Sequence, residues 1–380
     1  MKIVVAMDSF KGSMTSLEAG NAVAEGIHRA CPDVCVQVRP LADGGEGTVD
    51  ALVQGMGGSL RKVSVTGPLG EPVECTYGIL EERKTAVVEM SGAAGITLVA
   101  AERRNPLYTT TYGVGEVIRD AVSQGCRKFL VGIGGSATND GGVGMLQALG
   151  FGFLDEKGAQ VLPGARGLAK LAKITGEHAM PELAECDFRV ACDVTNELCG
   201  ELGCSAVFGP QKGATQEMIT DMDGWLGHYA KLAKESFPKA DPLRAGTGAA
   251  GGMGFAFLTF LNGILEPGIR IVLEETGLET FLPDADLVIT GEGRIDGQTA
   301  MGKAPAGVAE LAKKYGKTVI AFAGSVTKDA AACNANGIDA FFPILRSITT
   351  LEEAMEPAQA KENLADTAEQ AFRLWMAAKR

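Results

Sequence analysis

Two short apolar segments near opposite ends of the chain most strongly constrain its fold. Ile3–Met7 and Asp286–Thr290 are rich in valine and isoleucine, as expected of strands buried on both faces of a parallel sheet. A helical segment follows each strand. Thr15 and Glu18 match a capping box ahead of apolar residues at helical spacing, and Pro305–Tyr315 begins with a proline. Both ends therefore show the strand–helix alternation of a doubly wound α/β fold.

Neither end has enough strands to form a stable sheet alone. The further strands predicted at the two ends are 34–38, 318–323 and 339–345. Together the ends supply five strands with alternating helices. We therefore predict a discontinuous Rossmann- or flavodoxin-like domain from residues 1–62 and 286–380. A second α/β domain, 63–285, is inserted into it, with the active site expected in the cleft between the domains.

The inserted segment has its own strand and helix signals. A hairpin is predicted from 72–80 and 84–90, further strands at 128–133 and 187–192, and helices at 115–123 and 215–235. The uncharged stretch Gly246–Leu265 is long enough to span a bilayer, but its first half is glycine-rich and poorly apolar. We interpret it as a loop that leads into a buried helix.

Composition excludes several classes of protein. The chain has 380 residues, 46% of them hydrophobic, and a formal net charge of −12, which argues against a nucleic-acid or membrane-surface partner. Nine cysteines at irregular spacings and only three histidines favour reduced thiols over a zinc site. With no signal peptide recognised, we expect a cytoplasmic protein.

One glycine-rich segment imitates a dinucleotide fingerprint. Gly132–Ala137 follows a predicted strand and fits Gly-x-Gly-x-x-Ala, and Asp155 lies at a suitable distance beyond it. However, Thr138–Gly142 delays the following helix, and Asp140 would place a negative charge beside a pyrophosphate. An NAD site here therefore stays a minor alternative.

Two further segments resemble nucleotide motifs incompletely. Gly246–Gly251 fits Gly-x-Gly-x-x-Gly, but no predicted strand precedes it. Gly297–Ala304 is one residue away from a Walker A loop, with Ala304 where the magnesium-binding Ser or Thr would be. The chain is therefore not predicted to be a P-loop NTPase, although Lys303 remains free to meet a phosphate.

Three loops with polar side chains are more informative. Asp8–Gly12 places an acid, a hydroxyl and a lysine at the carboxyl end of a strand, where open α/β sheets bind ligands. Asp43–Thr48 offers amides at a helix N-terminus and carboxylates suited to magnesium or a sugar hydroxyl. Gly291–Asp296 repeats this pattern after another strand. Several such loops favour a ligand site over isolated solvated turns.

These loops also carry a resemblance to the type I (bacterial) glycerate kinases. The matching segments, in order, are Asp8–Ser13, Ala42–Thr48, Gly132–Gly142, Cys192–Asn196, Phe208–Ala214, Gly248–Gly254 and Ile289–Asp296. The chain departs from the family pattern at Met7, Glu197 and Ala245, where proline is usual. These departures alter loop rigidity more than chemistry, so they bear on affinity and not on the type of reaction.

The resemblance implies a function. Enzymes of this family transfer phosphate from ATP to D-glycerate, usually giving 2-phosphoglycerate, with Mg²⁺ as cofactor. It also implies two α/β domains, one of them discontinuous, and a place in glycerate, glyoxylate or sugar-acid catabolism. The expected partners are glycerate and ATP, with a homodimer as one assembly to test.

Phosphoryl transfer needs a proton acceptor and positive charge around the moving group. Asp193, after the predicted strand ending at Cys192, is our candidate base, with Asp8 and Asp140 next; the alternative is that Asp193 caps a turn. The candidate catalytic cations are Lys11, Lys212 and Arg294, each of which is otherwise a surface residue. The candidate substrate- and ATP-binding residues are Asp8, Ser9, Asp43, Gly44, Gly45, Glu46, Ser136, Asn139, Asp140, Glu292 and Asp296. Asp43 and Glu292 are also the candidate metal ligands.

Two other functions stay open at this point. One is an NAD-dependent hydroxy-acid dehydrogenase that uses Gly132–Ala137. Its weakness is that none of the three histidines lies in a glycine loop to accept the hydroxyl proton. The other is a non-catalytic metabolite-binding protein, which would not need so many acids beside lysines.

Overall fold

The computed structural model describes residues 1–45 and 47–379 and confirms the predicted α/β class. The chain divides into two compact units. The first comprises Met1–Asp43, Asp50–Gly57 and Ile269–Arg380, and the second Gly44–Val49 and Gly58–Gly268. The first unit is therefore discontinuous and contains both ends of the chain.

The first unit contains one parallel sheet of five strands in the order β2–β1–β11–β12–β13. Its strands are β1 (Lys2–Met7), β2 (Cys35–Val38), β11 (Leu287–Ile295), β12 (Val319–Val326) and β13 (Ala340–Pro343). Ile3 lies opposite Leu287, and Met7 lies opposite Gly291. The two apolar segments that the sequence singled out thus pair directly with each other.

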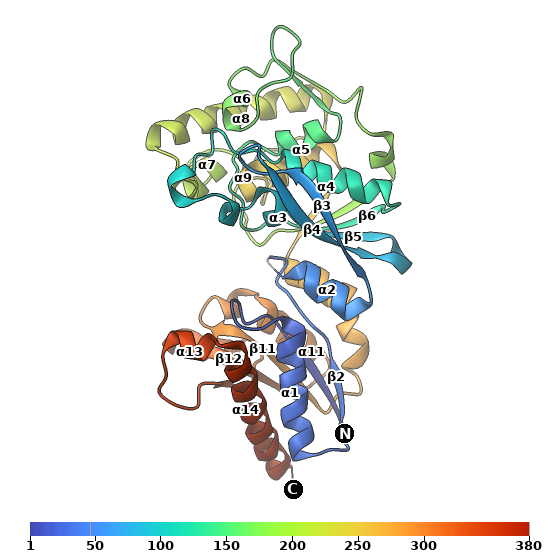
Figure 1. Ribbon diagram of the computed structural model, residues 1–380, viewed down its shortest axis with the longest axis vertical. Coiled ribbons are helices and arrows are strands. Elements are labelled where there is room, and N and C mark those ends of the chain that lie inside the picture. The colour runs from blue at the N-terminus through green and yellow to red at the C-terminus, as the bar shows by residue number, and fades with distance from the viewer. Residues whose placement is uncertain (46, 380) are drawn as a thin grey trace. The chain divides into compact units, whose positions relative to one another are not determined.

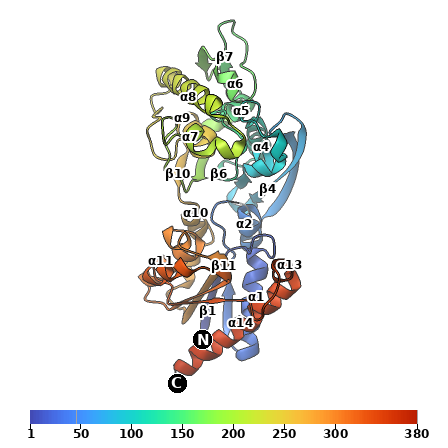
Figure 2. The same cartoon turned by 90° about the vertical axis from the view of Figure 1, so that its left-hand side faces the viewer.

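Helices cover both faces of this sheet. α1 (Ser16–Ala30) and α14 (Pro357–Ala378) lie side by side on one face, and α11 (Ala304–Lys314) lies on the other (Figures 1 and 2). The predicted capping box is present, because the Thr15 side chain accepts from the Glu18 amide and Glu18 accepts from the Thr15 amide. The predicted C-terminal helix is two helices, because α13 (Leu351–Met355) ends before Pro357 begins α14.

The strand order creates a switch point between β1 and β11. From β1 the chain continues to β2 on one side, whereas β11 and the strands after it extend the sheet on the other side. The loops that follow β1 and β11 therefore leave the sheet in different directions, which opens a crevice at their carboxyl ends.

The second unit contains a mixed sheet in the order β10–β9–β6–β5–β4–β3. Its strands are β3 (Ser59–Thr66), β4 (Pro72–Leu80), β5 (Thr85–Glu89), β6 (Lys128–Gly132), β9 (Asp187–Ala191) and β10 (Ile264–Glu266). From β5 to β10 the strands are parallel, and β3 and β4 add an antiparallel hairpin. A separate pair, β7 (Gly152–Leu154) and β8 (Lys173–Thr175), completes the strands.

The observed units begin and end at residues other than 62 and 286. β3 was not predicted as a strand, because it lies at the sheet edge and most of its side chains are exposed or half-buried. It pairs with β4 along its whole length, so the second unit includes residues from Gly58 onward. At the other boundary, Ile269 and the residues that follow it belong to the first unit.

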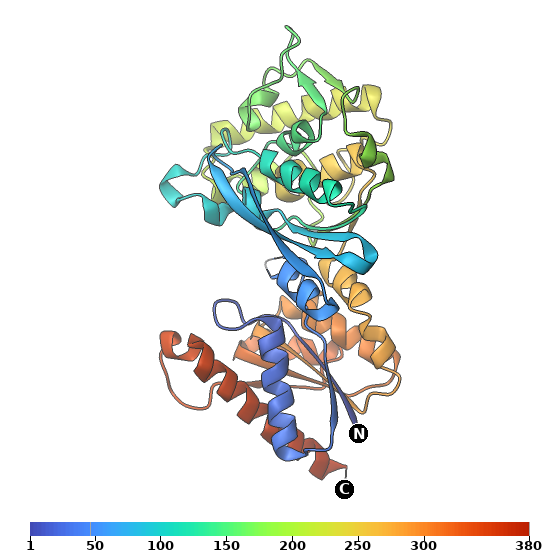
Figure 3. The same ribbon diagram turned by 45° about the vertical axis from the view of Figure 1, so that its right-hand side comes forward.

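Helices of different lengths pack around the second sheet (Figure 3). They include α3 (Ser91–Ala94), α4 (Tyr112–Ser123), α5 (Val143–Ala148), α6 (Ala165–Leu168), α7 (Cys204–Phe208), α8 (Gln216–Ser236) and α9 (Ala249–Phe260). Two other helices, α2 (Thr48–Met56) and α10 (Gly268–Glu275), begin in the second unit, but most of their residues belong to the first. α9 is the buried helix expected within Gly246–Leu265. Within the described part of the chain, no helix has the length and apolarity needed to cross a membrane.

A glycine allows α1 and α14 to pack closely. A Cβ added to Gly26 would lie 2.0 Å from the carbonyl oxygen of Ala365 in α14. We expect Gly26→Ala to lower the free energy of unfolding by about 2 kcal/mol, because backbone cannot move aside cheaply. Gly224→Ala is the matched control: that glycine lies in α8 with nothing within 4 Å, so alanine should stabilise by up to about 1 kcal/mol. Denaturant unfolding checks both; a neutral Gly26→Ala would contradict the packing argument.

Candidate functional site

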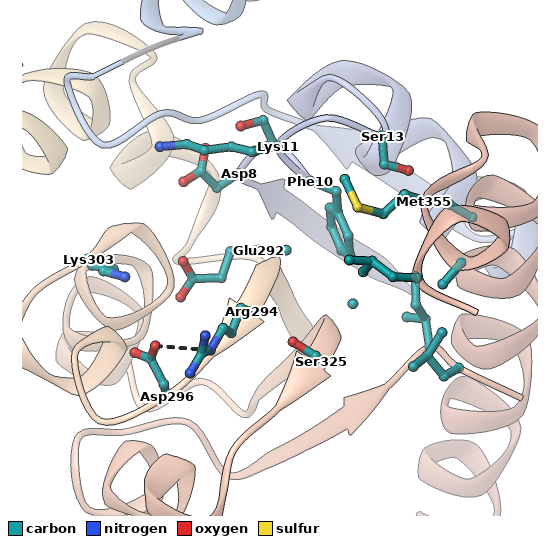
Figure 4. A pocket seen from close by; sticks show the side chains of 18 of the residues that line it. Asp8, Phe10, Lys11, Ser13, Glu292, Arg294, Asp296, Lys303, Ser325 and Met355 are labelled. Atoms are coloured by element: carbon teal, nitrogen blue, oxygen red, sulfur yellow. Dashed lines mark hydrogen bonds and ion pairs between the residues drawn. The ribbon is translucent and has the colours of Figure 1, made fainter. Parts of the chain in front are cut away.

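A cavity of about 380 Å³ lies in the first unit at the carboxyl ends of β1 and β11 (Figure 4). The charged residues that line it are Asp8, Lys11, Asp43, Glu292, Arg294, Asp296 and Lys303. This is the switch-point position at which open α/β sheets bind ligands. Six of these seven residues were named as site candidates from the sequence.

Asp8 is the first residue after β1 and is only 6% exposed. The amide of Ser9 donates to its Oδ1 at 2.7 Å. Burial raises the pKa of Asp8 to about 7, and the negative charges of Asp43 and Glu292 add to this effect, while Lys11 opposes it. A carboxyl group with such a pKa can accept and release a proton near neutral pH.

Glu292, within β11, is the second buried acid of the cavity. It is 8% exposed, and the Thr299 hydroxyl donates to its Oε1 at 2.6 Å. Burial raises its pKa, whereas the Thr299 hydrogen bond and the charge of Lys303 act in the opposite direction. Asp8, Lys11, Glu292 and Lys303 lie on the same side of the cavity in Figure 4. This side can therefore bind groups of either charge.

Arg294 and Asp296 form an ion pair on the same side, with 3.4 Å between Nε and Oδ2. The Arg294 side chain is 64% exposed, so the pair adds little to stability. Asp296 Oδ1 also accepts from the amides of Gln298 and Thr299. Asp296 therefore holds the turn after β11, and Arg294 is the more available of the two for a ligand.

Lys303 lines the cavity but was not among the predicted site residues. It occupies the N-cap position of α11, which begins at Ala304 and follows β11. The near-match to a Walker A loop was the sequence signal for it. Because Ala304 lacks the magnesium-binding hydroxyl, the segment was not predicted to be a P-loop, but Lys303 could still bind a phosphate.

In the second unit, Gly44 packs near the carboxyl end of β9. Gly44 has φ +86°, and a Cβ there would lie 2.5 Å from the Cβ of Ala191 and 2.7 Å from the Cα of Gly268. The amide of Val49 donates to Glu89 Oε1 at 2.8 Å. Gly45 accepts from the Thr48 hydroxyl at 2.7 Å. Glu46, a predicted ligand, lies outside the described residues.

Lys212 is buried in the second unit, with 2% of its surface exposed. Its Nζ donates to Ser136 Oγ at 2.8 Å and to the Thr138 carbonyl at 2.6 Å. Burial lowers the pKa of Lys212 to about 8. These contacts make Lys212 an anchor for the loop that follows β6, although the sequence had suggested a phosphate-binding cation.

Asp140 and Asn139 are also buried in this loop, at 1% and 0% exposure. Asp140 accepts from the Thr111 amide and hydroxyl, both at 2.9 Å, and from the amides of Gly142 and Gly144. Asn139 Nδ2 donates to Ser205 Oγ at 2.9 Å. Both residues are thus part of an internal network that holds the loop, and Asn139 Oδ1 is buried without a hydrogen-bond partner among the described residues. Their contact with a ligand stays a prediction.

Asp193 follows β9 and is exposed. Its Oδ1 accepts from the Gly268 amide at 3.1 Å, which is a contact across the sheet and not a cap within its own turn. The register places Gly132, Ala191 and Glu266, the last residues of β6, β9 and β10, side by side at the carboxyl ends of these parallel strands. Asp193 and the loop held by Lys212 therefore leave neighbouring strand ends.

The dinucleotide interpretation of Gly132–Ala137 finds no support in this geometry. After β6 the next helix, α5, begins only at Val143, so the glycines do not open a helix whose N-terminus faces a pyrophosphate. Asp155 belongs to a turn beyond β7, where it accepts from the amides of Lys157 and Ala159. β7 pairs with β8 and not with β6.

The raised pKa of Asp8 predicts a pH-dependent stability. Between about pH 4 and 7 the folded protein holds a proton that the unfolded chain has lost, so the free energy of unfolding falls as pH rises through this window. In Mg²⁺-free buffer, Asp8→Asn should remove this slope. It should be more stable than the wild type at pH 8 by roughly 2–4 kcal/mol, and equal to it near pH 4.

Denaturant unfolding at a series of pH values measures this effect. Asp33→Asn, at an exposed position of the same unit, serves as the control and should retain the wild-type slope. An unchanged slope in Asp8→Asn would contradict the assignment.

Known proteins resemble this chain along nearly its whole length. Residues 3–376 match the glycerate kinase family. Glycerate kinase from Haemophilus influenzae is 48% identical over 374 residues, covering 98% of each chain. Glycerate 2-kinase from Escherichia coli is 47% identical over 372 residues, covering 97% of this chain and 98% of that protein. A crystal structure of a Salmonella typhimurium LT2 protein described as a glycerate kinase 2 superposes with a TM-score of 0.92 at 46% identity, covering 100% of this chain and 99% of that one. The chain therefore belongs to the glycerate kinase family.

Proposed function

We propose that this chain phosphorylates D-glycerate on its 2-hydroxyl, with ATP as the phosphate donor. The observation that carries the proposal is identity of 47–48% over nearly full length to proteins named glycerate kinase and glycerate 2-kinase. In the reaction, the glycerate oxygen attacks the γ-phosphorus and the bond to the β-phosphate oxygen breaks. ADP leaves, and the hydroxyl proton passes to a base.

The cavity of the first unit supplies charges suited to this chemistry. Lys11 and Lys303 carry positive charge that can balance the phosphates of a nucleotide. Asp43 and Glu292 interact electrostatically with each other, and they supply the one or two carboxylates through which Mg²⁺ usually binds beside substrate phosphates. Across residues 1–45 and 47–379 no group of three or more metal-ligating side chains is assembled.

Mg²⁺, when bound, neutralises the charge that develops on the transferred phosphoryl group. The protein's own contribution is to hold Glu292 in place. Glu292 is fixed by Thr299 and by the sheet register, since its partner on β12 is Ala323. These contacts orient Glu292 before the ion binds, which lowers the entropy lost on binding.

Asp193 is the proposed base. It is exposed, and the backbone of Gly268 orients it through one carboxylate oxygen. A proton acceptor that is accessible and also oriented is what general-base catalysis needs. Asp8 is the second candidate, since its pKa of about 7 suits proton transfer at neutral pH.

Two assignments stay predictions. A cytoplasmic location is motivated by nine free cysteines, which suit a reducing compartment. A homodimer is the other.

The reaction itself is the first test. Purified protein with Mg²⁺, ATP and D-glycerate should form ADP and 2-phosphoglycerate, identified by ³¹P and ¹H NMR. L-Glycerate serves as the control acceptor and should react much more slowly. Phosphate found only on the 3-hydroxyl would overturn the regiochemistry, and an absence of ADP formation would overturn the kinase assignment.

Asp193→Asn tests the base. The amide oxygen of asparagine can still accept from Gly268, so the position should stay folded and oriented. Because the proton acceptor is lost, kcat should fall by about 10²–10⁴-fold, which corresponds to roughly 3–5 kcal/mol in the barrier. The KM for glycerate should change much less. Steady-state kinetics measure both, and near-normal kcat would transfer the role to Asp8.

A further inference from the structure

We propose that the cavity of the first unit binds the adenosine part of ATP, with the base against an apolar wall made by Phe10, Leu345, Leu351 and Met355. The proposal rests on ATP being the phosphate donor, and it assigns that donor a place. In Figure 4 Phe10 and Met355 lie on the side of the cavity away from Lys303 and Glu292.

The two sides of the cavity differ in chemistry. One side carries the carboxylates and lysines at the strand ends, and the other carries the apolar wall. Glycerate has oxygen on each of its three carbons, so it has no apolar surface to place against such a wall. A nucleotide has both kinds of surface: a flat heteroaromatic base and a charged phosphate chain. The two-sided cavity is therefore complementary to a nucleotide.

The size of the cavity also agrees with a nucleotide ligand. The volume of about 380 Å³ is within the range usual for cofactor-sized ligands, roughly 300–1,000 Å³. A three-carbon acid would leave most of that space to water.

An unpartnered hydroxyl lies on the apolar side. Ser13 Oγ is buried and has no hydrogen-bond partner among the described residues, and Ser13 lines the cavity near Met355 (Figure 4). A buried hydroxyl without a partner is unfavourable. The ring nitrogens and amino group of a purine, unlike a hydrocarbon, can satisfy it.

Two of the four wall residues, Leu351 and Met355, lie on the short helix α13 and are exposed. Leu351 is 76% exposed and Met355 37% exposed on α13. A capping box between Thr350 and Glu353 holds this helix without help from a hydrophobic core. Large apolar groups at the rim of a cavity mark a binding surface when they gather beside polar groups. The base would cover them.

The test compares nucleotide binding by two variants. Leu351→Ala combined with Met355→Ala removes the part of the wall that lies on α13. Leu374→Ala is the control, because Leu374 is 64% exposed on α14 and does not line the cavity. With Mg²⁺ held constant, calorimetry should show ADP binding about tenfold more weakly to the double variant. The control should bind ADP like the wild type. Pyrophosphate, which lacks the base, should bind to all three proteins equally.

Ser13→Ala adds an independent check. The dissociation constant of ADP should rise about fivefold, as for the loss of one ordinary hydrogen bond, and that of pyrophosphate should not change. Thermal unfolding of each variant verifies that it is folded.

The outcomes separate this proposal from the proposed function. If the wild type phosphorylates glycerate but the double variant binds ADP normally, the wall does not hold the base and the proposal is wrong. If pyrophosphate weakens as much as ADP, the wall acts on the cavity as a whole, which also overturns it. If the wild type binds ADP and the double variant loses that binding, the base site stands even if glycerate proves not to be the acceptor.

Discussion

The parallel pairing of β1 with β11 is the interaction on which the first unit depends. It pairs Ile3 with Leu287, two residues that are separated in the sequence by all residues of the second unit. The entropic cost of closing so long a segment grows only slowly with its length, and the pair is buried at essentially 0% exposure, which supplies hydrophobic free energy in return. The same register places Asp8 just beyond Met7 and opens the switch point beside it. The pairing of β1 with β11 therefore both joins the two ends of the chain in one sheet and places the cavity at its carboxyl end.

The buried acids of this cavity lower the stability of the fold that carries them. Asp8 and Glu292 each have a raised pKa mainly because burial disfavours the ionised form. Such costs concentrate at functional sites, where a ligand later compensates them. The surrounding sheet tolerates the cost because most residues of its three central strands, β1, β11 and β12, are buried. A ligand that brings positive charge or hydrogen-bond donors converts this unfavourable term into binding free energy.

Sequence reasoning succeeded where the local pattern and the fold agree. The apolar runs of β1 and β11 predicted strands, and Thr15 with Glu18 predicted a helix start. It missed β3, because an edge strand with exposed side chains lacks clear alternation. It also missed the burial of Lys212, since a lysine in a glycine-rich loop suggests phosphate binding unless tertiary contacts are known. The apolar wall residues on α13 could not be predicted either, because their place beside the cavity depends on tertiary contacts.

The glycine-rich loops show most clearly why motif resemblance alone misleads. A Cβ on Gly132 would lie 2.3 Å from the Gly44 carbonyl oxygen, and one on Gly251 would lie 2.1 Å from that of Thr138. Both glycines are thus required for close approach of one backbone segment to another, whether or not a phosphate is nearby. A nucleotide loop needs the same freedom for a different partner. What distinguishes the two is whether the backbone amides stay open to a ligand, and this depends on neighbours far away in the sequence.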